Sequence, residues 1–192
     1  MIYTIGHSTR ALDTFITLLQ AHGVTRLADI RTVPKSRRHP HFSGEALAIS
    51  LPAAGIAYRH FAGLGGLRKP RPDSTKTAWR HSGFRGYADY METPVFDRAL
   101  DELLGWSAQK SETMPEAPGM GSLRREGGGA RPTVIMCAEA VWWQCHRQLT
   151  ADALVARGFE VGHIMSSAAA APHLLTAFAR VTEGRVTYPG LI

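Results

Sequence analysis

The stretch Thr133-Val134-Ile135-Met136-Cys137-Ala138-Glu139 runs from β-branched and apolar residues into polar ones. A short apolar run of this kind predicts a buried strand. The tripeptide Cys145-His146-Arg147 follows, and we expect it to open a helix that continues through Arg157 and ends at Gly158. Because a strand that leads into a helix is the repeating unit of α/β proteins, this stretch decides the fold class.

Outward from that stretch, strands and helices alternate along the chain. Apolar runs predict strands over residues 2–5, 24–30, 56–61, 159–164 and 185–188. Apolar periodicity predicts helices capped by Ser8 or Thr9, from Ser43, around residues 87–91, from Thr93 and over residues 172–181. We therefore expect a single α/β domain over residues 1–192. Its sheet should be mostly parallel and open, with helices on both faces in a Rossmann-like three-layer arrangement.

Residues 107–132 interrupt this pattern. They are rich in Gly, Ser, Glu, Arg and Pro and include the run Glu126-Gly127-Gly128-Gly129. A segment with so few large apolar side chains cannot build a core of its own. The sequence therefore predicts a flexible surface insertion within the domain.

The composition indicates a soluble, basic protein with a formal net charge of +6. No apolar run is long enough to cross a bilayer, and the N-terminus lacks the pattern of a signal peptide. We therefore expect a cytoplasmic protein with no membrane partner, in which both cysteines are thiols. Basic clusters at residues 31–38 and 68–71 suit a phosphate-bearing small molecule or a nucleic acid. The sequence leaves the oligomeric state open.

Several polar residues lie where a predicted strand ends. They are, in chain order, His7, Asp29, Arg31, the Gly65-Gly66 turn, Cys137 and Glu139. In open parallel sheets, ligands bind beyond the carboxyl ends of the strands. We therefore expect these residues, although distant in sequence, to meet at one edge of the sheet.

The same residues belong to short pieces that resemble a known family. The pieces are Thr4-Ile5-Gly6-His7-Ser8, Asp29-Ile30-Arg31, Pro34-Lys35-Ser36-Arg37, Leu64-Gly65-Gly66, Tyr87-Ala88-Asp89-Tyr90-Met91, and Met136-Cys137-Ala138-Glu139 with Cys145-His146-Arg147. As a set they resemble the bacterial and archaeal proteins catalogued as domain of unknown function 488, over almost the whole chain outside residues 107–132. The resemblance implies a compact α/β fold and no established activity.

Cys145 is the candidate nucleophile. A cysteine at a helix N-terminus beside His and Arg is expected to be partly ionised, with Glu139 or His146 as its partner. The alternative is a small buried thiol without chemistry. Arg147 is only two residues away, so the sequence lacks the longer Gly-rich anion loop expected between a phosphatase-type cysteine and its arginine.

Further residues complete the predicted site. Glu139, Asp29 and His7 are candidates for acid–base catalysis. The structural alternative is that Asp29 with Arg31, or Glu139 with Arg147, forms an ion pair that locks a loop. The predicted substrate-binding residues are Arg31, Ser36, Arg37, Gly65, Gly66, His146 and Arg147. Aromatic rings that either stack on bases or belong to the core are Phe42, Trp79, Phe84 and Tyr87.

A metal site is a further alternative, with Cys137, Glu139, Cys145 and His146 as potential ligands. The Cys-x-Glu pair is similar to that of zinc deaminases, but the Cys-x-x-Cys pair of those enzymes is missing. Adjacent residues on a helix, as Cys145 and His146 are expected to be, also point about 100° apart. The sequence thus requires no cofactor, and zinc is a minor possibility.

Together these residues favour an enzyme with a basic Cys/His/Arg/Glu pocket that acts on a phosphate-bearing substrate. It would be a hydrolase or a transferase whose substrate is a nucleotide or a nucleic acid. Two alternatives stay open. One is a nucleic-acid-binding protein without catalysis, which the basic clusters and nearby aromatic residues favour. The other is a small-molecule sensor or protein-interaction module with residues 107–132 as its docking segment.

Overall fold

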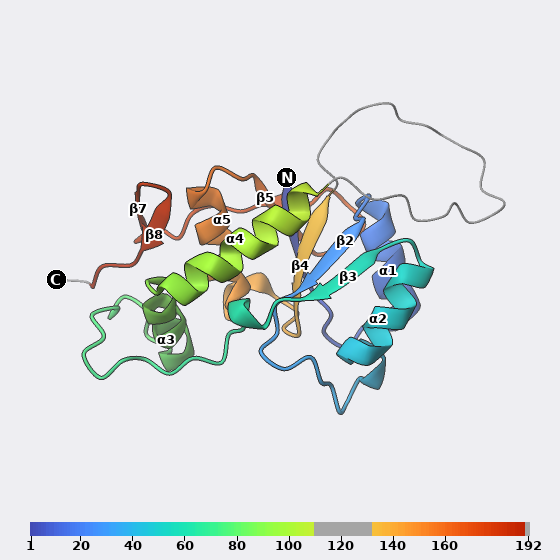
Figure 1. Ribbon diagram of the computed structural model, residues 1–192, viewed down its shortest axis with the longest axis horizontal. Helices are drawn as coiled ribbons and strands as arrows, with labels where there is room; N and C mark the ends of the chain where they lie inside the picture. Colours follow the sequence, from blue (N-terminus) through green and yellow to red (C-terminus); the bar gives the residue numbers. More distant parts are fainter. Residues whose placement is uncertain (110–131, 191–192) are drawn as a thin grey trace.

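A computed structural model of the protein describes residues 1–109 and 132–190 (Figure 1). The chain folds around a six-stranded sheet with the strand order β3-β2-β4-β1-β5-β6. The parallel strands are β1 (Ile2–Gly6), β2 (Arg26–Asp29), β3 (Ala57–His60), β4 (Thr133–Cys137) and β5 (Val161–Ile164). The short β6 (Ala171–Pro172) runs antiparallel to β5. The predicted mostly parallel α/β sheet is confirmed.

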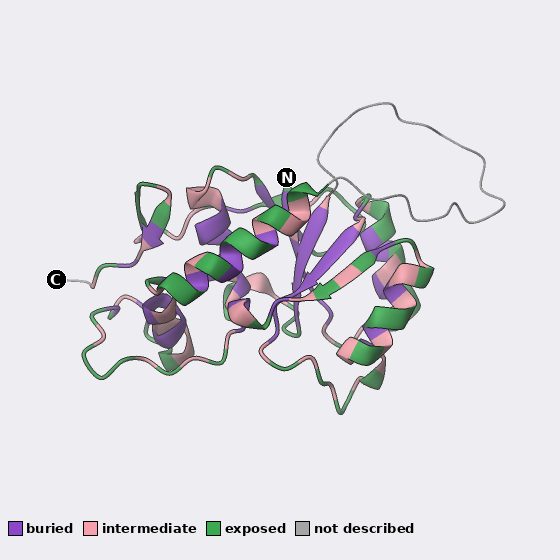
Figure 2. Cartoon of the chain, in the orientation of Figure 1, coloured by how far each residue is buried: buried purple, intermediate pink, exposed green. Residues whose placement is uncertain are grey.

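Helices cover both faces of this sheet. One face carries α1 (Leu12–Ala21) and α2 (Gly44–Ala53), and the other carries α3 (Ser82–Met91), α4 (Pro94–Ala108) and α5 (Arg147–Ala156). Successive strand residues enter opposite cores, because side chains alternate along a strand: Ile135 packs on one side, Val134 and Met136 on the other. All of β4 is buried, as Figure 2 shows. The predicted three-layer arrangement is therefore confirmed.

The connections contain smaller elements. In the described part of the chain, three short 3-10 helices lie between the longer elements: η1 (Pro40–Phe42), η2 (Ala62–Leu64) and η3 (Trp142–Gln144). A separate two-stranded hairpin is formed by β7 (Arg180–Thr182) and β8 (Arg185–Thr187). Of these elements, η3 matters most for the site, because it sets the geometry of the chain just before α5.

The neighbouring strands β1 and β4 send their connections to opposite faces of the sheet. β1 leads into α1, β4 leads into α5, and Gly6 pairs with Cys137 at the carboxyl ends of the two strands. Where two adjacent parallel strands diverge in this way, their loops leave a crevice in which ligands bind. The fold therefore places its natural binding site beside His7 and Cys137.

Most of the predicted helix ends are confirmed. The hydroxyl oxygen of Ser43 accepts a hydrogen bond from the backbone N–H of Ala46 (3.2 Å), and that of Thr93 accepts from Phe96 (3.3 Å). Gly158 follows α5 with a φ of 83°, a left-handed conformation that glycine adopts without a steric penalty. The local signals for the starts of α2 and α4 and for the end of α5 therefore agree with the fold.

Apart from the start of α5, two predictions of local structure are wrong. Residues 172–181 do not form a helix, because Pro172 pairs with Gly162 and the backbone N–H of His173 donates to the Val161 carbonyl oxygen (2.8 Å). Tertiary bonds thus outweigh a weak helical periodicity. Neither Ser8 nor Thr9 caps α1, which begins after Ala11 without a side-chain cap.

The structure describes only the ends of the predicted insertion. Most of residues 107–132 lie outside the described residues, so the prediction of an insertion and its suggested docking role stay predictions. Within the described part, Ser107 and Ala108 continue α4 and Pro132 precedes β4. Over residues 1–109 and 132–190, no helix is long and apolar enough to span a membrane.

Candidate functional site

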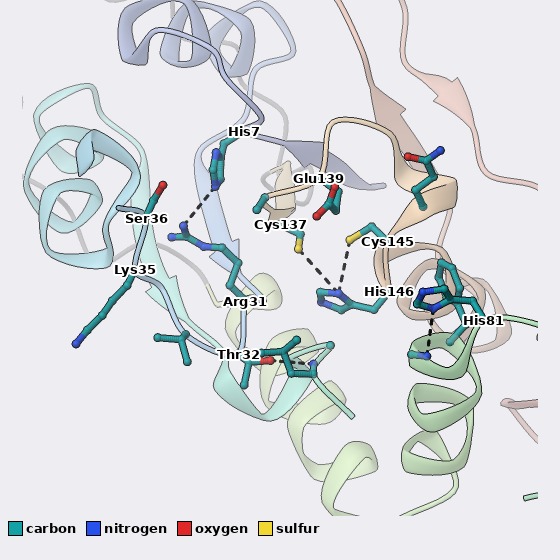
Figure 3. Close-up of a pocket in the computed structure, with 17 residues that line it drawn as sticks. His7, Arg31, Thr32, Lys35, Ser36, His81, Cys137, Glu139, Cys145 and His146 are labelled. Carbon is teal, nitrogen blue, oxygen red and sulfur yellow. Dashed lines mark hydrogen bonds between the residues drawn. The ribbon is translucent and has the colours of Figure 1, made fainter. Parts of the chain in front are cut away.

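A pocket of about 430 Å³ opens at the carboxyl ends of β1, β2 and β4. This volume is in the range of small-molecule sites, and the pocket lies where the sheet topology favours ligand binding. The predicted site residues that line it are His7, Arg31, Ser36, Gly66, Cys137, Glu139, Cys145 and His146 (Figure 3). Stretches distant in the sequence therefore meet at one edge of the sheet.

Arg31 forms one wall of the pocket and is held by Asp29. Its Nε lies 2.8 Å from Oδ1 of Asp29 and its NH2 lies 2.5 Å from Oδ2. Both side chains are buried, so the ion pair that the sequence analysis gave as the structural alternative is present. Asp29 does not line the pocket. From outside the pocket wall, Asp29 orients Arg31.

His7 contacts Arg31 from the end of β1. Its Nδ1–H donates to the Ser8 carbonyl oxygen (2.9 Å), which leaves Nε2 to accept from NH1 of Arg31 (3.4 Å). The ring also stacks on Phe42, with 4.3 Å between ring centroids. Burial lowers the pKa of His7 from 6.5 to about 4, and the positive charge of Arg31 acts in the same direction. His7 is therefore a neutral, oriented imidazole at neutral pH.

The opposite wall holds a cluster of two thiols and an imidazole. Nδ1 of His146 lies 3.5 Å from the sulfur of Cys145 and 3.9 Å from that of Cys137 (Figure 3). Nε2 of His146 lies 3.0 Å from the Ile30 carbonyl oxygen, which can only accept, so Nε2 carries the proton. In the neutral ring the lone pair of Nδ1 therefore points at both sulfur atoms.

The two thiols differ in acidity. The pKa of Cys145 lies well below its ordinary value, because the Cys137 thiol donates a hydrogen bond to it. His146, once Nδ1 holds a proton, and the positive charge of Arg147 also stabilise the thiolate. The pKa of Cys137 is raised, by its interaction with Cys145 and by burial. Cys145 is thus the thiol that ionises first, as expected of a nucleophile.

The local backbone explains why Cys145 and His146 converge. η3 ends at Gln144, and Cys145 is extended, with φ of −139° and ψ of 150°. The helix α5 begins only at Arg147. The expectation that Cys145 lies on the helix was therefore wrong by two residues, and so was the conclusion that the two side chains diverge.

This convergence also changes the set of possible metal ligands. The donor atoms of Cys137, Cys145 and His146 all lie within 4.8 Å of one another. Glu139, the fourth ligand considered from the sequence, is exposed and does not belong to this group of described residues. Of the four ligands considered from the sequence, the structure therefore brings together the two thiols and the imidazole.

Arg147 is buried beneath the loop that follows β4. Its NH2 donates to the backbone carbonyl oxygens of Glu139 (2.6 Å) and Ala140 (3.5 Å) rather than to a carboxylate. Its Nε has no hydrogen-bond partner among the described residues. Arg147 therefore supports the loop that carries Glu139, and it does not line the pocket.

Two other predicted binding residues lie outside the pocket wall. Arg37 is exposed on the loop of residues 31–38, which we call the basic loop. Gly65 is buried against Thr32, and a Cβ there would lie 2.5 Å from the Thr32 hydroxyl oxygen. Gly66 does line the pocket, and a Cβ on it would lie 2.2 Å from Nδ1 of His146. The glycine turn therefore gives the loop room to pack against His146.

Sequence reasoning missed several residues of the wall. They are Thr32, Val33, Lys35, Leu67, His81, Gly83, Ala138 and Gln144. Phe84 stacks on Trp79 (5.1 Å between centroids) and is the aromatic residue named from the sequence that reaches the pocket. Phe42 and Tyr87 are fully buried instead. Lys35 could have been found from its basic loop, whereas no signal of periodicity or spacing points to Phe84 or His81.

Comparison with known proteins places the chain in a family. A family model described as "Domain of unknown function DUF488" matches residues 11–114 and 108–154. The chain belongs to the DUF488 family. No curated protein and no solved structure matches it. The matched segments of this DUF488 protein contain Arg31, Cys137, Cys145 and His146, whereas His7 precedes them.

In this DUF488 protein the pocket combines three chemical capabilities. Cys145 with His146 provides a thiolate and an adjacent imidazole. Arg31 provides a guanidinium that is already oriented by buried partners. Glu139 provides a carboxylate at the pocket surface. A thiol, an imidazole, a guanidinium and a carboxylate thus face one cavity.

Proposed function

We propose that this DUF488 protein is an enzyme that acts on a phosphate-bearing substrate, a nucleotide or a nucleic acid, with Cys145 as its nucleophile. One observation carries the proposal: Cys145, with its sulfur 3.5 Å from Nδ1 of His146, lines the same cavity as Arg31. A reactive thiol and an oriented guanidinium on one cavity favour a substrate that carries both an electrophilic centre and a negative charge.

The phosphate would lie against Arg31, Ser36 and Lys35. The buried carboxylate of Asp29 compensates most of the charge of Arg31, so the exposed Lys35 supplies the further positive charge that attracts an anion. The backbone N–H of His39 donates to the Ser36 hydroxyl oxygen (3.1 Å), which leaves the hydroxyl proton for a ligand.

The remaining wall suits an apolar or aromatic part of the substrate. Val33 and Leu67 line the pocket although they are 53% and 79% exposed. Phe84 adds an aromatic ring to the same pocket. Exposed apolar side chains grouped at a pocket mark a ligand contact, and a nucleobase gains stacking energy on such a surface. This wall is the reason for preferring a nucleotide over a simple phosphate ester.

The proposed reaction has two steps. The Cys145 thiol transfers its proton to Nδ1 of His146, and the thiolate attacks the electrophilic centre. The bond to the leaving group breaks, and the leaving group takes the proton from Nδ1. Water then attacks the covalent intermediate and transfers a proton to Glu139, which releases the product and leaves Cys145 as the thiolate. Glu139 then returns this proton through solvent to Cys145, so both groups recover their starting states.

Steady-state assays against nucleotides, phosphoesters and short oligonucleotides would test the proposal. Cys145→Ser should abolish any activity found, and Glu139→Gln should lower it by about 10²–10⁴-fold, the usual contribution of a general base. Glu102→Gln, on the exposed side of α4, is the matched control and should keep the activity. Unchanged activity in both Cys145→Ser and Glu139→Gln would remove the assignment.

A second candidate function is nucleic-acid binding without catalysis. It is favoured by the exposed cations Lys35, Arg37 and Arg38, which follow Arg31 on the loop beside the pocket. Phosphate contacts of this kind give binding that weakens steeply with salt. In this case, binding would remain after Cys145→Ser, because no covalent step is involved.

A further inference from the structure

The thiol–imidazole cluster has the dimensions of a metal site. In a tetrahedral complex, bond lengths of about 2.3 Å to sulfur and about 2.0–2.1 Å to nitrogen place the two ligand atoms about 3.6 Å apart. Nδ1 of His146 lies 3.5 Å from one sulfur and 3.9 Å from the other. Both sulfur–nitrogen separations are therefore close to those that a bound ion requires, and all three donor atoms lie within 4.8 Å of one another.

The imidazole is also oriented as a metal ligand. Histidine ligands commonly donate their second N–H to a carbonyl or carboxylate, which fixes the ring and directs the other nitrogen at the metal. In His146 the Nε2–H donates to the Ile30 carbonyl oxygen (3.0 Å) and Nδ1 faces the sulfur atoms. The ring of Tyr87 packs against it, with 5.1 Å between centroids. The ligand geometry is thus held by groups outside the cluster.

The ligand types select the kind of ion. Two sulfur atoms and one imidazole nitrogen suit soft or borderline cations such as Zn²⁺ and Cu⁺, whereas Mg²⁺ and Ca²⁺ prefer oxygen ligands. All three residues line the pocket, so a fourth coordination position faces the cavity. Three protein ligands with an open fourth position are typical of exchangeable or reactive zinc sites rather than closed structural ones.

We propose that Cys137, Cys145 and His146 bind a thiophilic cation, with Zn²⁺ as the reference ion, and that the fourth ligand comes from the pocket. The ion engages the same Cys145 sulfur that the proposed reaction uses, so the bound ion blocks the nucleophile. This regulatory consequence rests on the proposed function. The ion site itself does not.

The test uses the full chain, reduced and treated with a chelator, without any substrate. Titration with Co²⁺ should produce a thiolate-to-cobalt charge-transfer band that saturates at one equivalent and disappears when Zn²⁺ is added. Loss of a residue that only hydrogen-bonds to a metal ligand weakens metal binding by roughly 10–100-fold. Cys137→Ala and His146→Ala each remove a ligand itself, so each should weaken Zn²⁺ binding by more than this. His22→Ala, which removes a histidine that does not line the pocket, is the matched control and should keep the affinity.

A second measurement covers variants that fail to fold, which circular dichroism would reveal. In the wild-type protein, one equivalent of Zn²⁺ should slow the alkylation of both cysteines by iodoacetamide, followed peptide by peptide with mass spectrometry. A wild-type protein without the cobalt band, a band that survives both variants, or alkylation of Cys145 that Zn²⁺ leaves unchanged would each overturn the site. Failure of every nucleotide assay would leave these results standing, so the two proposals fail separately.

Discussion

Both carboxylate oxygens of Asp29 accept hydrogen bonds from the guanidinium of Arg31, and this ion pair lies beneath the pocket. The distances are 2.8 Å from Nε to Oδ1 and 2.5 Å from NH2 to Oδ2. The Tyr58 hydroxyl also donates to Oδ2 (2.9 Å), and burial together with the Asp29 carboxylate raises the pKa of Tyr58. The remaining nitrogen of Arg31 is directed at His7. Asp29 therefore determines where the guanidinium lies.

This relationship gives a prediction for stability. Asp29→Asn should destabilise the fold by about 3–5 kcal/mol, because it leaves the buried guanidinium of Arg31 without its counter-charge. The free energy of unfolding in urea measures the effect. Glu102→Gln is the control: it removes the carboxylate that pairs with Arg59 on the surface and should cost less than about 1 kcal/mol. Equal losses in the two variants would contradict the role given to Asp29.

Gly66 and His146 provide a second prediction. A Cβ at position 66 would lie 2.2 Å from Nδ1 of His146, so Gly66→Ala must displace the ring. We expect a loss of about 1–3 kcal/mol in unfolding free energy, as for other overpacked sites. A Cβ on Gly105, inside α4, meets nothing within 4 Å, and Gly105→Ala should instead stabilise the fold by up to about 1 kcal/mol. A neutral Gly66→Ala would show that the ring moves freely.

Much of the site was predictable because parallel strands share one direction. His7 and Arg31 follow the ends of β1 and β2, Cys137 is the last residue of β4, and the carboxyl ends of these three strands lie side by side. Their convergence therefore follows from strand order and periodicity alone. Phe84 and His81 come instead from the start of α3, which no sheet register positions. Only the packing of the folded chain brings them to the pocket.

The metal ligands show how a small local error changes a chemical conclusion. Periodicity places Cys145 on a helix, yet Trp142 stacks on the buried His163, with 4.1 Å between centroids, and η3 occupies the turn before α5. Cys145 is extended as a result. A shift of the helix start from Cys145 to Arg147 turns diverging side chains into converging ones. Such a shift depends on a tertiary contact that local sequence does not encode.

The basic loop gives a third prediction, which bears on the partner. If phosphates bind along this loop, Arg37→Ala should weaken binding of a single-stranded oligonucleotide and lower the slope of log affinity against log salt by about 0.7 for the lost contact. Arg98→Ala removes the same charge from an exposed position on α4 and should leave the slope unchanged. Identical slopes for the two variants would show that the loop makes no phosphate contact.

A chain of buried hydrogen bonds behind the pocket has a fixed direction. The Asp152 carboxylate accepts from Nε2–H of His173 (2.9 Å), so Nδ1 of His173 accepts from Nε2–H of His163 (2.9 Å). Nδ1 of His163 in turn accepts from the Thr4 hydroxyl (2.8 Å). Burial lowers the pKa of His163 to about 3, and the positive charge of Arg147 acts in the same direction.

The neutral histidines give the last prediction, a loss of stability on mild acidification. Between pH 6.5 and about 4 the unfolded chain protonates His7 and His163, while the folded protein keeps both rings neutral. Because the unfolded state then binds more protons, the unfolding free energy must fall as the pH falls through this window, and it is fully retained above it. Urea titrations across the window measure the slope of the unfolding free energy against pH.

His163→Asn removes one of the two titrating groups. Its slope should therefore be shallower than that of the wild type, even though the variant is less stable throughout. An unfolding free energy that stays constant from pH 6.5 down to about 4 would mean that these rings are protonated in the folded protein.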